Sequence, residues 1–174
     1  MRQQLIDALP PDDSILEELE KENPDAARQV HYLMHHAHCP PYKDTYTRYL
    51  PLGEVKFEAL VEELKKAERY IFLEYFIVEE GIMWNSILDI LKEKAAAGVD
   101  VRMIYDDFGC IMKLPYRYDR KLEKMGIKCC RFSPFIPVLS TRLNNRNHRK
   151  IAVIDGHTAF TGGINLADEY INAI

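Results

Sequence analysis

Hydrophobic residues recur along this chain with two different periods, and the period changes from one segment to the next. In segment 54–67 the apolar residues are three and four positions apart, as on one face of a helix. The apolar segment 69–78 that follows is typical of a buried strand. Two more helix and strand pairs follow, at 82–97 with 99–106 and at 116–125 with 127–132. This alternation predicts an α/β fold with a largely parallel sheet and helices covering its faces.

Ahead of this regular pattern, residues 12–36 carry apolar positions at helical spacing until the sequence CPPY interrupts them. We expect residues 1–47 to form a helical appendage and residues 48–174 to form the α/β domain. A chain of 174 residues, 47% of them hydrophobic, is long enough for one such domain with a full core.

The apolar runs and the cysteines indicate whether the chain crosses a membrane and in which compartment it is found. The longest apolar run, YIFLEYFIV, has nine residues and contains a glutamate, far short of the roughly 20 that cross a bilayer. The four cysteines follow no secretory signal segment, so we expect reduced thiols in the cytosol.

Charge is distributed unevenly along the chain. The net charge of −4 argues against non-specific binding of nucleic acid. Residues 1–30 carry eight acids and three bases, whereas residues 124–154 carry seven bases and no acid. An anionic ligand is therefore expected at residues 124–154.

A β-hairpin is predicted inside this basic region. Its strands are 148–154 and 157–161. The dipeptide Asp155-Gly156 between them is a strong short-range hairpin signal. Because side chains alternate along a strand, His148 and Lys150 share one face and can reach one ligand, while Asp155 points to the other face. We expect Asp155 to hold the hairpin rather than to contact His148.

The residues after the hairpin add donors for an anion. Gly162 and Gly163 permit close approach of the backbone. Asn165 precedes LADEY, with Asp168 three positions later, which is the pattern of a helix N-terminus with an asparagine cap. Free N–H groups at such an end, together with an asparagine amide, a lysine and a histidine, predict a phosphate site without a metal.

The spacing of these residues matches the motif HxKx4Dx6GGxN, so the chain resembles the phospholipase D superfamily. The flanking sequences YLPLGEVKFEALVEELKKAERYIFLEYFIVEEG, YDDFG and GGINLADEYIN are similar to the first catalytic half of bacterial cardiolipin synthases, from about Arg48 to Ile174. This resemblance implies a phospholipase D-like α/β/α sandwich with a mostly parallel mixed sheet. The residues that fall on the motif are His148, Lys150, Asp155, Gly162, Gly163 and Asn165.

The resemblance also implies a two-step phosphatidyl transfer between phosphatidylglycerol molecules, with no metal and no other cofactor. The histidine of one motif attacks the phosphodiester to form a phosphohistidine. The histidine of a second motif protonates the leaving alcohol and then activates the acceptor hydroxyl. His148 is the implied nucleophile, and Lys150 and Asn165 would stabilise charge on the phosphoryl oxygens. The carboxylate that orients the histidine usually lies downstream of the asparagine in this family.

The chain departs from the full-length family pattern in two ways. It carries one copy of the motif, and it lacks N-terminal membrane helices. It is therefore either a fragment or a protein that pairs with a second copy, so that each chain contributes one His148. We expect a soluble or peripheral chain that contacts phospholipid at the cytoplasmic face of the bacterial membrane through basic residues 142–150, with no nucleic-acid partner.

Other polar residues are candidates for the same ligand. Glu74 and Asp106 fall at strand ends, where ligands bind in parallel sheets, although acids there also cap helices. The loop before His148 would either clamp a lipid phosphate or remain solvated. Its candidate residues are Arg142, Asn144 and Arg146. The histidines between residues 31 and 38, with Cys39, suggest a solvated helix end rather than zinc, because no second pair has ligand spacing.

Three functions fit the sequence. The first is a phosphatidyltransferase half with phosphatidylglycerol as donor, which the flanking sequences favour. The second is a phosphodiesterase of the same superfamily that hydrolyses phospholipid or nucleic acid. The third is a non-catalytic domain that binds anionic phospholipid.

Overall fold

The computed structural model describes residues 13–135 and 145–173, and the chain divides into two compact units, residues 1–49 and 50–174. The first unit holds helices α2 (Asp13–Glu22) and α3 (Pro24–Tyr32) and the short π-helix η1 (Leu33–Ala37). The prediction of one helix over residues 12–36 is wrong at Asn23. Its side chain accepts a 3.1 Å hydrogen bond from the Ala26 backbone N–H, and Pro24 follows, so a new helix begins there.

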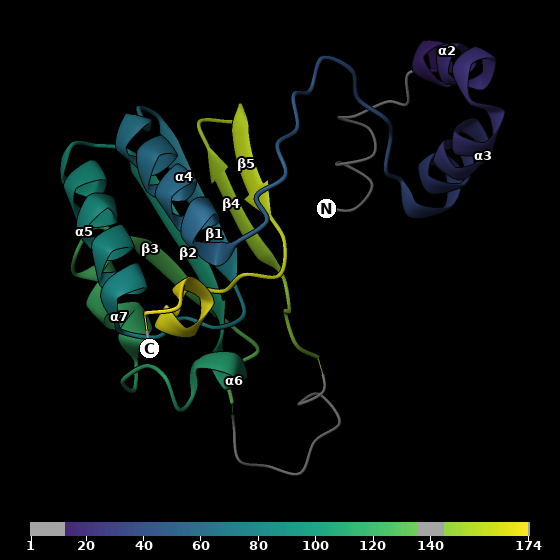
Figure 1. Ribbon diagram of the computed structural model, residues 1–174. Helices are drawn as coiled ribbons and strands as arrows, with labels where there is room; N and C mark the ends of the chain where they lie inside the picture. The colour runs from purple at the N-terminus through teal and green to yellow at the C-terminus, as the bar shows by residue number, and fades with distance from the viewer. Residues whose placement is uncertain (1–12, 136–144, 174) are drawn as a thin grey trace. The chain divides into compact units, whose positions relative to one another are not determined.

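The second unit is built on a five-stranded mixed sheet with the strand order β3-β2-β1-β4-β5 (Figure 1). The strands are β1 (Tyr70–Tyr75), β2 (Asp100–Asp106), β3 (Lys128–Phe132), β4 (Lys150–Ile154) and β5 (Thr158–Thr161). Strands β1, β2 and β3 run parallel, whereas β4 is antiparallel to β1 and β5 is antiparallel to β4. The predicted α/β class and mixed sheet are confirmed.

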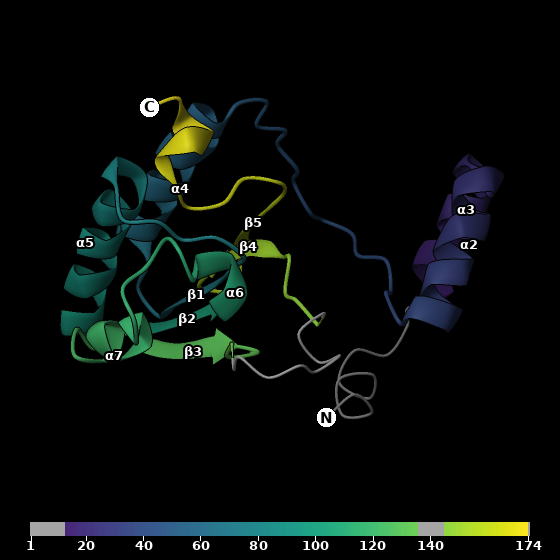
Figure 2. The same ribbon diagram turned by 90° about the horizontal axis from the view of Figure 1, so that it is seen from below.

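Helix α4 (Gly53–Lys66) precedes β1, and the other helices of the second unit lie between or after its strands. Helix α5 (Ile82–Ala96) connects β1 with β2, α6 (Asp107–Cys110) and α7 (Tyr118–Glu123) lie between β2 and β3, and the 3₁₀-helix η3 (Asp168–Ile171) follows the hairpin. Helices α4 and α5 lie side by side against one face of the sheet (Figures 1 and 2). On the opposite face, Ile104 and Phe132 each remain 37% exposed among the described residues.

The core lies between the sheet and helices α4 and α5. Ile71, Leu73 and Tyr75 alternate with partly exposed residues along β1 and are buried in one cluster with Leu60 of α4 and Trp84 of α5. Burial of this apolar surface is the main stabilising term of the second unit.

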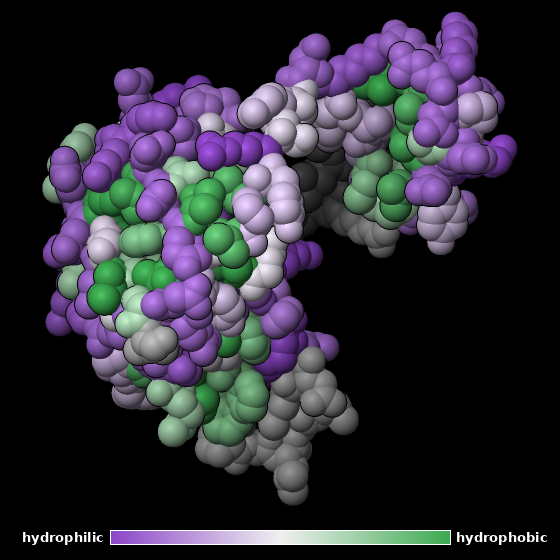
Figure 3. All heavy atoms as spheres, in the orientation of Figure 1, coloured by the Kyte–Doolittle hydropathy of each residue, from purple (hydrophilic) through white to green (hydrophobic). Residues whose placement is uncertain are grey.

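Two features of the surface and the helices concern contact with a membrane. Exposed hydrophobic side chains gather at α6 and the segment after it, where Figure 3 shows hydrophobic spheres, and they include Phe108, Ile111 and Met112. None of the helices within residues 13–135 and 145–173 is long and apolar enough to cross a bilayer.

Candidate active site

His148 and Lys150 both lie against the ring of Phe76, which follows the end of β1. The imidazole and the Phe76 ring have centroids 4.8 Å apart, and the Lys150 Nζ lies 5.2 Å from the Phe76 centroid. The strand register explains this arrangement, because Lys150 is paired with Tyr75, the last residue of β1. The structure thus brings the predicted nucleophile and the predicted cation to one place.

Lys150 is a buried ammonium group. Its residue is 4% exposed, and its Nζ donates a 2.7 Å hydrogen bond to the His148 backbone oxygen. Burial lowers the pKa of this lysine. No ion pair of the described residues includes Lys150, so its charge is available to an anion.

The imidazole of His148 is exposed and, within residues 13–135 and 145–173, it has no hydrogen-bond partner. The predicted orienting carboxylate is therefore not supplied by the described residues. The residue is exposed to solvent, and solvent exposure is what the predicted role of nucleophile requires.

Asn165 does not cap a helix, so that prediction is wrong. The 3₁₀-helix η3 begins only at Asp168, and the backbone before it is extended, with Leu166 bridged to Val78. The Asn165 Oδ1 accepts a 3.0 Å hydrogen bond from the Ile77 N–H, and its Nδ2 donates a 2.8 Å bond to the Tyr170 hydroxyl. The expected helix N-terminus is therefore not found at Asn165, and the bond to Tyr170 uses one of the two amide N–H groups of Asn165.

Asp168, which the sequence pattern placed in the same cap, serves another helix. Its two carboxylate oxygens accept 2.8 Å hydrogen bonds from the backbone N–H groups of Ile82 and Met83, at the start of α5. The carboxylate thus caps α5 from a distant part of the sequence and neutralises the positive end of that helix.

Asp155 lies at the far end of β4 from Lys150. Its carboxylate accepts 2.8 Å hydrogen bonds from three successive backbone N–H groups, those of Glu68, Arg69 and Tyr70. These bonds hold the pKa of Asp155 below its usual value. Asp155 therefore ties the hairpin turn to the start of β1 and does not contact His148.

Gly162 and Gly163 border open space. A Cβ built on either residue would have no neighbour within 4 Å, and Gly162 has a φ of +150°, which favours glycine. The chain itself does not crowd these two glycines. The space beside them can therefore accept a ligand.

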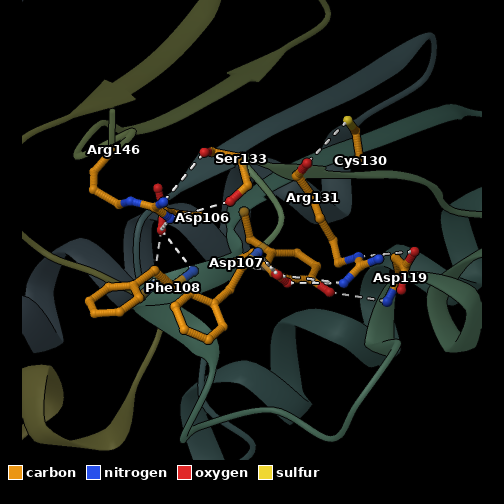
Figure 4. Close-up of polar contacts among 11 residues, drawn as sticks. Asp106, Asp107, Phe108, Asp119, Cys130, Arg131, Ser133 and Arg146 are labelled. Carbon is orange, nitrogen blue, oxygen red and sulfur yellow. Dashed lines mark hydrogen bonds and ion pairs between the residues drawn. The ribbon is translucent and has the colours of Figure 1, made fainter. Parts of the chain in front are cut away.

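The acids at the strand ends organise the segment that enters β4, and Figure 4 shows the contacts of one of them, Asp106. Asp106 is fully buried, and its carboxylate accepts bonds from the N–H groups of Phe108, Gly109 and Asn147 and from the Arg146 guanidinium. Glu74 accepts a 2.5 Å bond from the Asn147 amide. Both acids position the residue before His148, and direct contact of either acid with a ligand stays a prediction.

The basic loop is described only in part. Arg146 contacts the Ser133 backbone oxygen and hydroxyl at 3.3 Å, and its guanidinium lies 5.2 Å from the Phe108 ring centroid. It therefore braces the loop against β2, β3 and α6. Arg142 and Asn144 lie outside the described residues, so their predicted phosphate contacts stay predictions.

No group of three metal-ligating side chains occurs within the described ranges of the chain. His31 and His35 have ring centroids 4.3 Å apart in the first unit, without a third ligand among the described residues.

Sequence reasoning missed three residues of this site: Lys56, Phe76 and Tyr170. The signal for Lys56 was present, because Lys56, Leu60 and Leu64 lie four residues apart and form the buried stripe of α4. A lysine in an apolar stripe is expected to be buried, and lysines are rarely buried without a partner, so this position indicates a specific role. The contact of Phe76 with His148 joins segments distant in sequence and left no such signal. Tyr170 is only five residues from Asn165, but no periodic pattern pointed to a hydrogen bond between them.

The geometry defines a class of protein: a mixed α/β fold with a five-stranded sheet that brings a histidine and a lysine together against one aromatic ring at the start of β4. Residues 60–173 match the family described as cardiolipin synthase, PLD-like domain. The chain therefore belongs to the cardiolipin synthase branch of the phospholipase D superfamily.

Individual relatives agree with this assignment. An uncharacterized protein of Streptococcus mutans is 48% identical over 163 residues, which are 94% of this chain and 35% of that protein. A cardiolipin synthase of Geobacillus sp. strain WCH70 is 46% identical over 128 residues, 73% of this chain and 25% of the enzyme. Cardiolipin synthase 2 of Bacillus anthracis is 41% identical over 128 residues, with the same coverage. The chain thus spans between a quarter and about a third of the length of these relatives.

The fold also resembles a solved structure. NucT from Helicobacter pylori aligns with a TM-score of 0.51 and 19% sequence identity, over 70% of this chain and 74% of NucT. At this identity the likeness concerns the fold alone.

Proposed function

We propose that this chain is one half-site of a cardiolipin synthase-type phosphatidyltransferase, with His148 as the nucleophile. The single observation that carries the proposal is the contact of His148 and Lys150 with Phe76, which presents an open imidazole beside an unneutralised buried ammonium group. A neutral imidazole can attack near pH 7, and the ammonium group would stabilise the charge that develops on the phosphoryl oxygens.

The proposed chemistry has two steps. In the first, an imidazole nitrogen of His148 bonds to phosphorus, and the bond from phosphorus to the leaving glycerol oxygen breaks. A histidine of a second half-site donates a proton to that oxygen. In the second step, the same histidine takes the proton of an acceptor hydroxyl, whose oxygen attacks phosphorus and releases His148.

The second half-site is supplied either by another part of a longer protein or by a second copy of the chain. The residues described here contain one copy of the motif, and the relatives named above are three to four times as long as the matched region. A mass measurement in solution distinguishes a paired chain from a single one.

The test is to incubate the protein with phosphatidylglycerol and, separately, with single-stranded DNA. Where two half-sites pair, we expect cardiolipin and free glycerol from the lipid, and a covalent lipid adduct of His148 after quenching under alkaline conditions, detected by mass spectrometry. His148→Ala should abolish the adduct, whereas His157→Ala, an exposed histidine of the same hairpin, should retain it. Hydrolysis of either substrate without transfer would support a phosphodiesterase instead, and no turnover by a paired chain that binds the lipid would support the non-catalytic alternative.

We further propose peripheral contact with anionic membranes. The exposed side chains at α6 and the basic residues before β4 are the supporting features (Figure 3). Sedimentation with phosphatidylglycerol vesicles should weaken in Met112→Ser and at high salt, whereas Leu52→Ser, an exposed residue at the start of α4, should behave as the parent chain. Equal sedimentation of all three proteins would contradict this contact.

A further inference from the structure

Lys56 of α4 is a buried lysine that reaches the segment between the glycine pair and Asn165. It is 4% exposed and lies on the stripe of α4 that faces the core. Its Nζ donates a 3.1 Å hydrogen bond to the Ile164 backbone oxygen and lies 5.5 Å from the ring centroid of Tyr75. Lys56 thus connects a helix with the peptide group that directly precedes Asn165.

Lys56 and Lys150 form a pair of buried ammonium groups without a carboxylate partner. No ion pair of the described residues includes either lysine, and each donates to one backbone carbonyl, Lys56 to Ile164 and Lys150 to His148. Burial, with the charge of Lys150 as a further cause, lowers the pKa of Lys56 to about 8. Two uncompensated charges in a buried region destabilise the fold unless an anion joins them.

A purely structural role explains Lys56 poorly. The methylene chain could contribute packing, but a methionine of similar length would fill the same volume without a buried charge. Stability of the fold therefore does not explain why this position carries an ammonium group, and a functional role does. The charged or titrating groups that lie against the Lys56 ammonium are Lys150 of β4 and Tyr75 of β1, and neither supplies a negative charge at neutral pH. Helix η3, which packs against α4, carries Asp168 and Glu169, but neither forms an ion pair with Lys56 in the part of the chain that the structure describes.

We propose that Lys56 is a positioning residue of the phosphoryl site. It holds the Ile164 carbonyl, and through it the segment from Gly162 to Asn165, in the arrangement that presents the Asn165 amide. Its charge adds to that of Lys150, so the site favours a ligand with phosphate-like negative charge. This inference rests on the proposed function, because the ligand is the phosphoryl group that His148 attacks.

The experiment measures binding of inorganic phosphate to the 174-residue chain by calorimetry at pH 7 and low salt. Lys56→Met should weaken phosphate binding by about tenfold or more, as loss of a charged hydrogen-bonding group does elsewhere. The matched control is Lys65→Met, which removes the same charge from an exposed position of the same helix and should leave the affinity unchanged.

Thermal unfolding of the same variants separates a functional role from a structural one. Lys56→Met should melt at the same temperature as the parent chain or higher, because it removes a desolvated charge. The side-chain amide signals of Asn165 in an NMR spectrum should shift in Lys56→Met and not in Lys65→Met. Weaker phosphate binding together with a lower melting temperature and unshifted Asn165 signals would indicate a structural lysine and overturn the inference.

Lys150→Met distinguishes this inference from the proposed function. If phosphate binding falls in Lys150→Met but not in Lys56→Met, only the role of Lys56 is overturned. If the parent chain binds phosphate no better than Lys150→Met, the proposed site and the role of Lys56 fail together.

Discussion

The ammonium group of Lys150 donates a 2.7 Å hydrogen bond to the backbone oxygen of His148, two residues earlier in the chain. The cation of the motif thereby holds the backbone that carries the proposed nucleophile, at the point where β4 begins. Lysine has three N–H donors, so two remain for phosphoryl oxygens. The two residues act as one unit, and the effects of substituting them should not add.

Removal of the Lys150 side chain should therefore damage catalysis more than stability. We expect Lys150→Ala to slow formation of the phosphohistidine by about 10²-fold or more in the assembled site, as loss of an oxyanion donor does elsewhere. Rapid-quench measurement of the adduct gives this rate. Lys128→Ala, which removes an exposed lysine of β3, serves as the control, and equal rates in the two variants would refute the role of Lys150.

Tyr170 should support the reaction through Asn165. Tyr170→Phe removes the 2.8 Å hydrogen bond to the Asn165 Nδ2 but leaves the bond between Asn165 and the Ile77 N–H. We expect the rate of phosphohistidine formation to fall by roughly 3- to 10-fold, since a single neutral hydrogen bond contributes about 1 kcal/mol. Asn165→Ala should lower the rate by about 10²-fold or more. A rate equal to that of the parent chain in Tyr170→Phe would mean that the bond to Ile77 orients Asn165 alone.

Substitution of Asp155 should lower the free energy of unfolding without changing the rate of phosphohistidine formation. Asp155→Ala leaves three backbone N–H groups at the start of β1 without their acceptor and should lower the free energy of unfolding by about 1 to 3 kcal/mol. Urea denaturation measures this change. Asp89→Ala, at an exposed position of α5, should change the free energy of unfolding by less than about 0.5 kcal/mol.

The contribution of Asp155 should also depend on pH. Because its pKa is lower in the folded state than the ordinary 3.8, the stabilisation is complete well above pH 3.8 and is lost as the pH falls through the folded-state pKa. The stability difference between the parent chain and Asp155→Ala should therefore shrink below about pH 4. A difference that stays constant down to pH 2 would contradict this assignment.

Lys56 should add a second pH dependence, on the alkaline side, where the free energy of unfolding again rises with pH. Its pKa is about 8 in the folded chain and 10.5 as the ordinary value, so between these pH values the unfolded chain binds the additional proton. The free energy of unfolding should therefore rise with pH over this window, by a few kcal/mol at most. In Lys56→Met this rise should be absent, which chemical denaturation at pH 7.5, 9 and 10 can measure. A parallel pH profile for the two proteins would contradict the lowered pKa.

The order of elements could be predicted from the sequence because helix and strand periods are local properties. The helix expected over residues 82–97 is Ile82–Ala96, and the strand expected over 127–132 is Lys128–Phe132. The break at Asn23 was also visible in principle, since Asn-Pro is a helix-start signal. The strand expected over 69–78 ends at Tyr75, because Ile77 and Val78 bond with residues 165 and 166 instead.

The motif spacing predicts His148, Lys150 and Asn165 as residues of the site, whereas only the tertiary structure decided what each one contacts. Asn165 and Asp168 have the spacing of a local helix cap, yet their partners, Ile77 and the start of α5, lie 85 to 88 residues away in the sequence. The contact of Lys56 could not be predicted from local sequence either, because its hydrogen-bond partner Ile164 is 108 residues away. A local pattern records which face of a helix or strand is apolar, but the partner of a polar group is set by the strand order that folds β4 beside β1.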